Sequence, residues 1–299
     1  MYTWENLLMY NKTFKKDHTL GVTFLQSIQQ ETYEKSEIKV KDLPYENQEW
    51  NNIGLAQTIE SVSSDYRRWR LASFMGRVNY NFKDRYLLTI SARYDGSSRL
   101  ATGHKWVLFP SAAFAWRIKE ESFLKDVDYL SNLKLRLGWG ITGNTAIDPY
   151  KTQGSLSYGR YSYGSNGVLA FYQNEMPNPN LSWEKTQQWN AGIDFGFLNG
   201  RIGGSVDLYL QNTNDLLMDR QLPIVSGFGG VTTNIGKTRN KGLEITLNTI
   251  NIDTKDFKWS TDVMFSTNKE EIVELYNGKV DDEGNKWFIG QPVRHANRG

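Results

Sequence analysis

Three carboxylates occupy positions where an acid/base pair could form. Asp194, Asp207 and Glu244 fall on the polar positions of segments in which polar and apolar residues alternate. Two carboxylates flanking a sugar are the arrangement of a glycosidase. Basic residues share these polar faces, so we expect the carboxylates to line a wet interior and form ion pairs there. No catalytic constellation is recognisable, and the sequence does not predict an enzyme. The basic residues are Arg77, Arg93, Lys134 and Arg136.

Histidine and glycine positions argue against two other kinds of site. His18, His104 and His295 lack ligand spacing to one another, so no zinc site or histidine-centred catalysis is expected. The glycines at 226–230 are not followed by Lys-Ser or Lys-Thr, as a phosphate-binding loop requires. The sequence therefore predicts no metal site and no cofactor.

One stretch could bind a ligand through aromatic side chains. Residues 154–174 are rich in Gly, Ser and Tyr and lie in the longest expected loop. Aromatic rings can stack on sugar rings or peptide side chains, while hydroxyl groups supply hydrogen bonds. A mobile surface loop without a ligand explains the same composition. The candidate ligand contacts are Tyr158, Tyr161, Tyr163, Phe171 and Tyr172.

These residues lie on or between about ten segments of strict polar and apolar alternation. From Ala72 to Phe82, for example, apolar residues or glycine occupy every second position, and residues such as Arg77 and Asn79 lie between them. Successive side chains of a strand point to opposite faces, so each strand has one apolar and one polar side. This pattern is typical of a transmembrane strand between lipid and a polar lumen. The expected strands span residues 2–13, 18–31, 66–82, 85–97, 105–118, 132–143, 183–198, 201–213, 238–251 and 256–268.

The connections between these strands alternate in length. Tight polar turns are expected at 15–17, 83–84, 199–200 and 252–255. Long connections fall between them, which is how outer-membrane barrels separate short periplasmic turns from long extracellular loops. The long loops are expected at about 32–65, 144–182 and 214–237.

Two groups of residues suit a membrane interface. Residues 65–70 read Asp-Tyr-Arg-Arg-Trp-Arg. They could bind an anion, but cations whose side chains reach from the membrane rim into water explain them better. Several tryptophans near predicted strand ends suit an aromatic girdle. They are Trp4, Trp69, Trp106, Trp116, Trp183 and Trp259.

Composition alone does not reveal a membrane protein. A chain of 299 residues with 39% hydrophobic residues would usually be a soluble protein of one or two domains. A membrane barrel is polar on half of each strand and in its loops, so average hydropathy does not detect it. The net charge of +2 gives no electrostatic argument for binding nucleic acid.

Several motifs, in this order, resemble the SusC/RagA family of TonB-dependent outer-membrane transporters. The resemblance extends from about Tyr2 to Gln291. Its motifs are Arg77–Thr89, Arg93–Arg99, Phe109–Arg117, Leu133–Asn144, Pro179–Lys185, Asn234–Gly236 and Asn240–Glu244.

The resemblance implies a location in the cell outer membrane and an antiparallel transmembrane β-barrel. The complete barrel would have about 22 strands around an N-terminal plug. It also implies active uptake of oligosaccharides or peptides, energised through the TonB complex, with a SusD-like surface lipoprotein as partner. Outer-membrane lipid would surround the wall.

We expect this sequence to be a piece of such a protein, or its start to be misassigned. It lacks a plug, a TonB box and a closing strand, and Met1 is not followed by a signal peptide. Residues 1–299 are therefore expected to be a partial, all-β barrel domain of about ten strands, an open curved sheet that aggregates or needs detergent in isolation. A passive porin-like or adhesin-like barrel without energy coupling is the alternative function.

Overall fold

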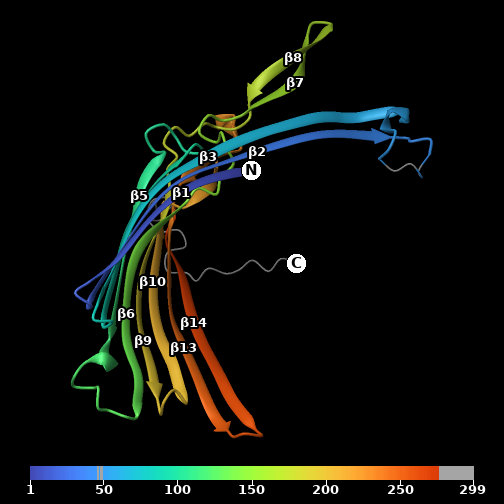
Figure 1. Ribbon diagram of the computed structural model, residues 1–299. Coiled ribbons are helices and arrows are strands. Elements are labelled where there is room, and N and C mark those ends of the chain that lie inside the picture. The colour runs from blue at the N-terminus through green and yellow to red at the C-terminus, as the bar shows by residue number, and fades with distance from the viewer. Residues whose placement is uncertain (46, 48–49, 276–299) are drawn as a thin grey trace, which may run out of the picture.

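The computed structural model describes residues 1–45, 47 and 50–275 as one curved antiparallel sheet with two small hairpins (Figure 1). The ten strands of the sheet follow the order β1-β2-β3-β4-β5-β6-β9-β10-β13-β14, so each strand pairs with the preceding strand of the wall. Their bounds are β1 Tyr2–Phe14, β2 His18–Lys41, β3 Thr58–Phe82, β4 Tyr86–Ser97, β5 Trp106–Arg117, β6 Leu130–Asn144, β9 Glu184–Phe197, β10 Ile202–Asn214, β13 Lys237–Asp253 and β14 Lys258–Glu274.

Smaller elements lie in the connections of this sheet. One hairpin pairs β7 with β8, and the other pairs β11 with β12. Among the described residues, no helix is long and apolar enough to cross a membrane. The bounds are β7 Leu156–Tyr163, β8 Asn166–Gln173, β11 Leu217–Gln221 and β12 Gly230–Asn234, with short 3-10 turns η2 Ile53–Leu55, η3 Ile118–Glu120 and η4 Ile224–Ser226.

All ten predicted strands are confirmed, but the loop predicted at 32–65 is mostly strand. β2 continues to Lys41 and β3 begins at Thr58, so the two strands form a long arm that projects beyond the wall (Figure 1). Charged residues on this arm, such as Glu37 and Lys39, interrupt the apolar alternation without interrupting the backbone pairing. Polar and apolar alternation arises where one face of a strand is buried or contacts lipid. It therefore does not predict the outer parts of β2 and β3, where both faces contact water.

The sheet has two rims and two open edges. The turns between β1 and β2, β3 and β4, β9 and β10, and β13 and β14 are short and form the short-turn rim. The opposite end, the long-loop rim, carries both small hairpins. β1 and β14 each pair with a single neighbour in the described part of the chain, so the sheet is open. Unpaired edge groups cost several kcal/mol each in hydrocarbon, which agrees with a partial barrel.

The pairing register is nearly continuous across the wall. Register shifts occur at four places, and each lies within a few residues of a strand end. Between these places the register is unbroken wherever two strands pair, so residues of one face stay on that face across the sheet. The shifts lie at Lys39/Val40, Leu130/Asn132, Lys237/Thr238 and Ile250/Ile252.

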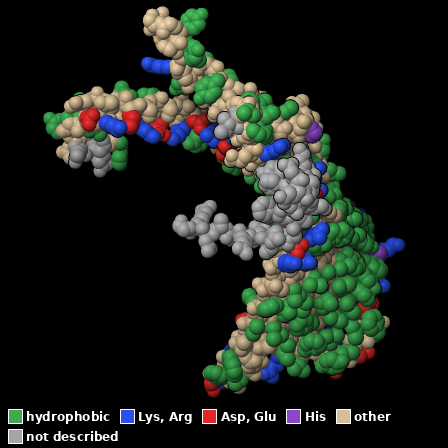
Figure 2. Space-filling view, turned by 180° about the vertical axis from the view of Figure 1, so that it is seen from behind, with side chains coloured by type: hydrophobic (Ala, Val, Ile, Leu, Met, Phe, Trp, Pro, Cys, Tyr) green, Lys and Arg blue, Asp and Glu red, His purple; other side chains and the backbone are tan. Residues whose placement is uncertain are grey.

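Aromatic side chains mark the height of an apolar band on the convex face. Hydrophobic side chains cover the lower convex wall in Figure 2. Near the short-turn rim Tyr86 stacks between Phe82 and Trp116, with ring centroids 6.2 and 6.3 Å away. Farther up, Trp106 lies 6.4 Å from Phe74 and 5.0 Å from Tyr94. About eight residues, or about 25 Å of strand, separate the two rows, which matches the apolar band of outer-membrane barrels.

Two of the tryptophans predicted for the girdle lie elsewhere. Trp183 is buried with Leu100, Phe109 and Leu181 in a small core at the long-loop rim. Its indole donates a hydrogen bond of 2.8 Å to the Lys105 carbonyl. Trp69 packs against an arginine, as described below. Both girdle predictions were wrong because proximity to a strand end does not show which face a ring occupies.

Candidate functional site

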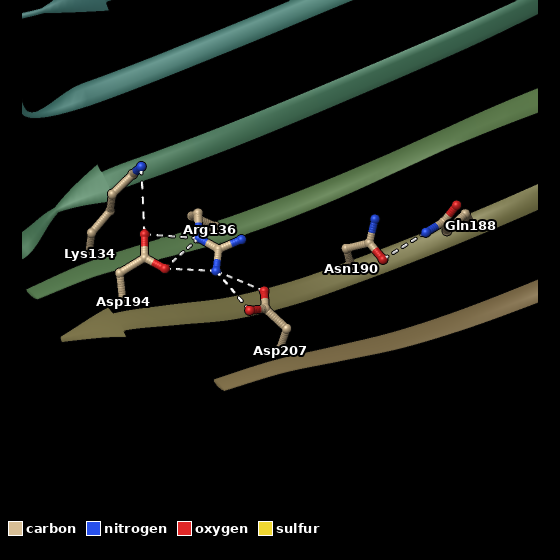
Figure 3. Close-up of polar contacts among 6 residues, drawn as sticks. All are labelled: Lys134, Arg136, Gln188, Asn190, Asp194 and Asp207. Carbon is tan, nitrogen blue, oxygen red and sulfur yellow. Dashed lines mark hydrogen bonds and ion pairs between the residues drawn. The ribbon is translucent and has the colours of Figure 1, made fainter. Parts of the chain in front are cut away.

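Charged residues of three adjacent strands form a network on the concave face (Figure 3). Arg136 on β6 donates from Nε to Asp194 on β9 at 2.9 Å, and its Nη2 reaches Asp207 on β10 at 2.8 Å. Lys134 lies 3.7 Å from the second oxygen of Asp194. Two cations and two carboxylates thus balance one another in a partly exposed cluster.

A glycine between the two partners makes the network possible. Gly192 on β9 pairs with Arg136 on one side and with Asp207 on the other. A side chain there would overlap the Asp207 carboxylate and the Arg136 guanidinium. Because position 192 has no Cβ, the guanidinium crosses the intervening strand and joins β6 to β10.

A polar groove of about 490 Å³ adjoins this network. Amide side chains supply most of its remaining polar surface, and Gln188 donates to Asn190 at 3.1 Å. Tyr209 donates to Asn268 at 3.1 Å on the far side. Such a surface can exchange hydrogen bonds with hydroxyl and amide groups of a passing solute. The other polar residues of the groove are Arg136, Asp207, Gln211, Asn240 and Glu244.

The expected pairing of the carboxylates is confirmed for Asp194 and Asp207, which bind Arg136. Glu244 lines the same groove. Arg93 departs from the expectation, because it pairs with Asp95 on its own strand at 2.8 Å. The polar positions on neighbouring strands were predictable from alternation. The position of Tyr209 on the concave face was not predicted, because an aromatic residue gives no sequence signal for a lumen-facing position.

The structure divides the five predicted aromatic contacts between two faces of one exposed hairpin. Tyr158 and Phe171 are directly paired across β7 and β8, with rings 6.5 Å apart. Tyr161, Tyr163 and Tyr172 occupy the alternate positions and so face the other way. All five are more than half exposed, and the hairpin projects from the long-loop rim (Figure 1). A small ligand can contact one of these sets at a time.

A contact of an arginine with a tryptophan at the long-loop rim was not predicted from the sequence. The Arg99 guanidinium lies over the Trp69 ring and donates from Nη1 to the Thr145 carbonyl at 3.1 Å. Burial lowers the pKa of Arg99, and the nearby Glu31 and Asp148 oppose this shift. The contacts join residues far apart in sequence, which no local pattern reveals.

The basic cluster at 65–70 makes specific polar contacts at the long-loop rim. Arg67 binds Asp65 at 2.7 Å and Asp148 at 3.2 Å. Arg70 donates to Gln30 at 2.6 Å. The cluster therefore links the long arm to the loop after β6.

Histidines do not form a metal site in the part of the chain that the structure describes, which holds no group of three His, Asp or Glu suited to a metal ion. The His18 ring is hydrogen-bonded to the Tyr80 hydroxyl at 2.6 Å. His295 lies outside the described residues.

Comparisons with known proteins agree with the two-faced sheet. The family model described as "TonB dependent receptor-like, beta-barrel" matches residues 1–296. The TonB-dependent receptor SusC of Bacteroides thetaiotaomicron is 45% identical over 221 residues, which cover 71% of this chain and 22% of that protein. The TonB-dependent receptor P26 of Formosa agariphila is 35% identical over 278 residues, covering 93% and 28%.

A solved structure gives the same result in three dimensions. The structure titled "Structure of the RagAB peptide transporter" matches with a TM-score of 0.84 and 26% identity, covering 96% of this chain and 32% of that one. The chain thus spans between 22% and 32% of the length of these relatives.

Proposed function

Because the chain belongs to the TonB-dependent receptor-like β-barrel family, we propose that it forms part of the wall of an active nutrient importer. The protein is located in the outer membrane, as its relatives are. The full protein would carry out the transport, and these strands would contribute the wall, the lumen lining and several loops.

The concave polar surface is the observation that carries the proposal. The network around Arg136 and the adjoining amide-rich groove cross five strands on one face, while the other face is apolar and bears two aromatic rows. A polar lumen behind a lipid-facing wall is what a transporter of hydrophilic solutes requires. By the same family rule, the long-loop rim would face the outside of the cell and the short turns the periplasm.

The partners and substrates follow from the relatives. A SusD-like lipoprotein would cover the extracellular mouth, and the TonB complex would supply energy. Oligosaccharides or peptides are the substrates we propose, since one similar structure is titled a peptide transporter and one similar protein is SusC. Membership of a TonB-dependent family favours this importer over a passive porin-like or adhesin-like barrel.

The hairpin of β7 and β8 is the proposed contact for such solutes. Its aromatic residues stand at the long-loop rim, where an arriving solute would first meet the barrel. Since the two sets face opposite ways, we assign ligand contact to one set, either Tyr158 with Phe171 or Tyr161 with Tyr163 and Tyr172.

Uptake by the full-length protein tests the proposal. Cells that produce it, with its neighbouring lipoprotein if one is encoded, would be supplied with labelled oligosaccharides or labelled peptides, and accumulation would be measured with and without functional TonB. Accumulation that depends on TonB is expected. Equal uptake in both strains would indicate a passive barrel, and dependence on the lipoprotein gene would identify the lid.

A further inference from the structure

The convex wall contains a groove of about 480 Å³ across β5, β6, β9 and β10, to which Leu88 of β4 also contributes. Two alanines create it. Ala191 lies between Leu137 and Leu208 in one cross-strand row, and Ala112 lies beside Trp139 in the next row. Large side chains surround these small ones, so the surface is hollowed where each methyl group replaces a longer chain. All four strands have neighbours on both sides, and an open edge of the sheet therefore does not cause the groove.

The end of the groove that is nearer the long-loop rim lies at the height of the aromatic row formed by Phe74, Tyr94 and Trp106. Trp139 and Trp189 are paired, with ring centroids 5.8 Å apart. They stand about eight or nine residues from the short-turn ends of their strands, as Phe74 and Tyr94 do on β3 and β4. Tryptophans at this level occupy the boundary between acyl chains and headgroups.

A polar atom at this end has no partner. The Trp139 indole nitrogen is enclosed and makes no hydrogen bond in the structure. A buried N–H without an acceptor is costly, so a small rotation of the ring toward an acceptor would be favoured. At the membrane boundary the ester and amide oxygens of lipids are available as acceptors.

We propose that this groove binds one acyl chain of an outer-leaflet glycolipid of the lipid A type, with Trp139 donating to its ester or amide carbonyl. The groove is continuous with the lipid-facing wall, is apolar along its length and has its one unpaired donor at the boundary where the carbonyl of such a chain lies. The assignment to the outer leaflet rests on the proposed orientation, in which the long-loop rim faces outward.

Lipid retention by the full-length protein tests this site. The protein would be extracted from outer membranes in mild detergent, and glycolipid and phospholipid bound per protein would be measured by native mass spectrometry. Ala191→Leu fills the groove, whereas Trp139→Phe keeps the ring and removes the N–H. Ala92→Leu on β4 is the matched control, because it makes the same change on the exposed convex face outside the groove.

The wild type and Ala92→Leu are expected to retain one glycolipid that Ala191→Leu loses. Trp139→Phe should weaken retention by roughly two- to tenfold, the effect of one hydrogen bond. Equal glycolipid retention in all four proteins would overturn the proposal, as would retention of phospholipid alone. Uptake by the wild type separates the two proposals. TonB-dependent uptake by a protein that retains no glycolipid would contradict only the lipid site, and glycolipid retention without TonB-dependent uptake would contradict only the importer.

Discussion

The guanidinium of Arg99 lies 4.2 Å from the ring centroid of Trp69, and this contact ties the connection after β4 to the neighbouring strand β3. Ser98 adds a backbone hydrogen bond of 2.9 Å to Arg70, and Arg99 reaches on to the Thr145 carbonyl. One arginine thus connects the loop after β4 and the long loop after β6 to the wall, at the rim where we place the entrance.

Replacing this arginine should loosen the rim. Arg99→Lys keeps the charge but loses the flat guanidinium that stacks on Trp69. We expect the contact between the loop and β3 to lose about 1 kcal/mol of stabilisation, and the two loops to be cleaved faster by a protease. Arg68→Lys, on the opposite face of β3 and exposed, is the control. Limited proteolysis of the full-length protein measures the effect, and identical cleavage of the two variants would contradict it.

A methyl group at position 192 should break the charge network. Gly192→Ala would overlap both the Asp207 carboxylate and the Arg136 guanidinium. Because these groups are about one-third exposed, we expect a loss of only about 0.5–1 kcal/mol in unfolding free energy from the lost ion pair, in addition to any strain.

The control for this variant is Gly203→Ala on β10. Position 203 shares the concave face, and an added Cβ there would have only ordinary contacts. In a protein that already carries Asp207→Asn, Gly192→Ala should lower the unfolding free energy by less, because less of the ion pair remains to be lost. An unchanged cost in that background would show that the glycine is required for another reason.

Acid should weaken the short-turn rim through Glu121. Its carboxylate accepts hydrogen bonds from Tyr86, Trp116 and Arg85. The Tyr86 hydrogen bond, followed by that of Trp116, holds the pKa of Glu121 below its ordinary value of 4.5. The folded state therefore favours the charged form, so this stabilisation is complete above pH 4.5 and is lost as the pH falls through the lowered pKa.

Thermal unfolding in detergent over that pH range measures this effect. Glu121→Gln should unfold at a lower temperature than the wild type at neutral pH, and the difference should shrink in acid. Glu120→Gln serves as the control, because Glu120 is a neighbouring exposed residue that forms an ion pair with Arg117 instead. A constant difference between wild type and Glu121→Gln at all pH values would refute the assignment.

The two faces of the β7–β8 hairpin should differ in ligand binding. Alanine at Tyr158 and Phe171 removes one set of rings, and alanine at Tyr161 and Tyr172 removes rings from the other. We expect one double variant to bind a transported solute roughly 5- to 30-fold more weakly and the other to bind normally, because each lost stacking ring costs about 1 kcal/mol. Titration of the full-length protein decides which set is used, and unchanged affinity in both would remove the hairpin from the binding site.

Alternation predicted the wall because lipid and lumen impose opposite demands on successive residues. Ala72 to Phe82 shows the pattern clearly, and it is part of β3 as expected. The same reasoning failed on the arm formed by β2 and β3, where water lies on both sides. It also missed β7 and β8, since their tyrosines are exposed on either face.

The site was predictable only in part. The polar positions of Arg136, Asp194 and Asp207 follow from strand periodicity, but the register that brings them together comes from pairing across strands. The need for Gly192 and the stacking of Arg99 on Trp69 depend on that register or on loop paths. No local sequence pattern predicts either feature.

The placement of the four register shifts limits how such walls can change length. Inserting one residue in the middle of β9 would turn every later side chain of that strand around, exposing Asp194 to lipid and sending Ile193 into the lumen. Insertions and deletions inside the span should therefore occur two residues at a time, whereas single-residue changes should collect at the strand ends, where a bulge such as that at Ile250/Ile252 absorbs them.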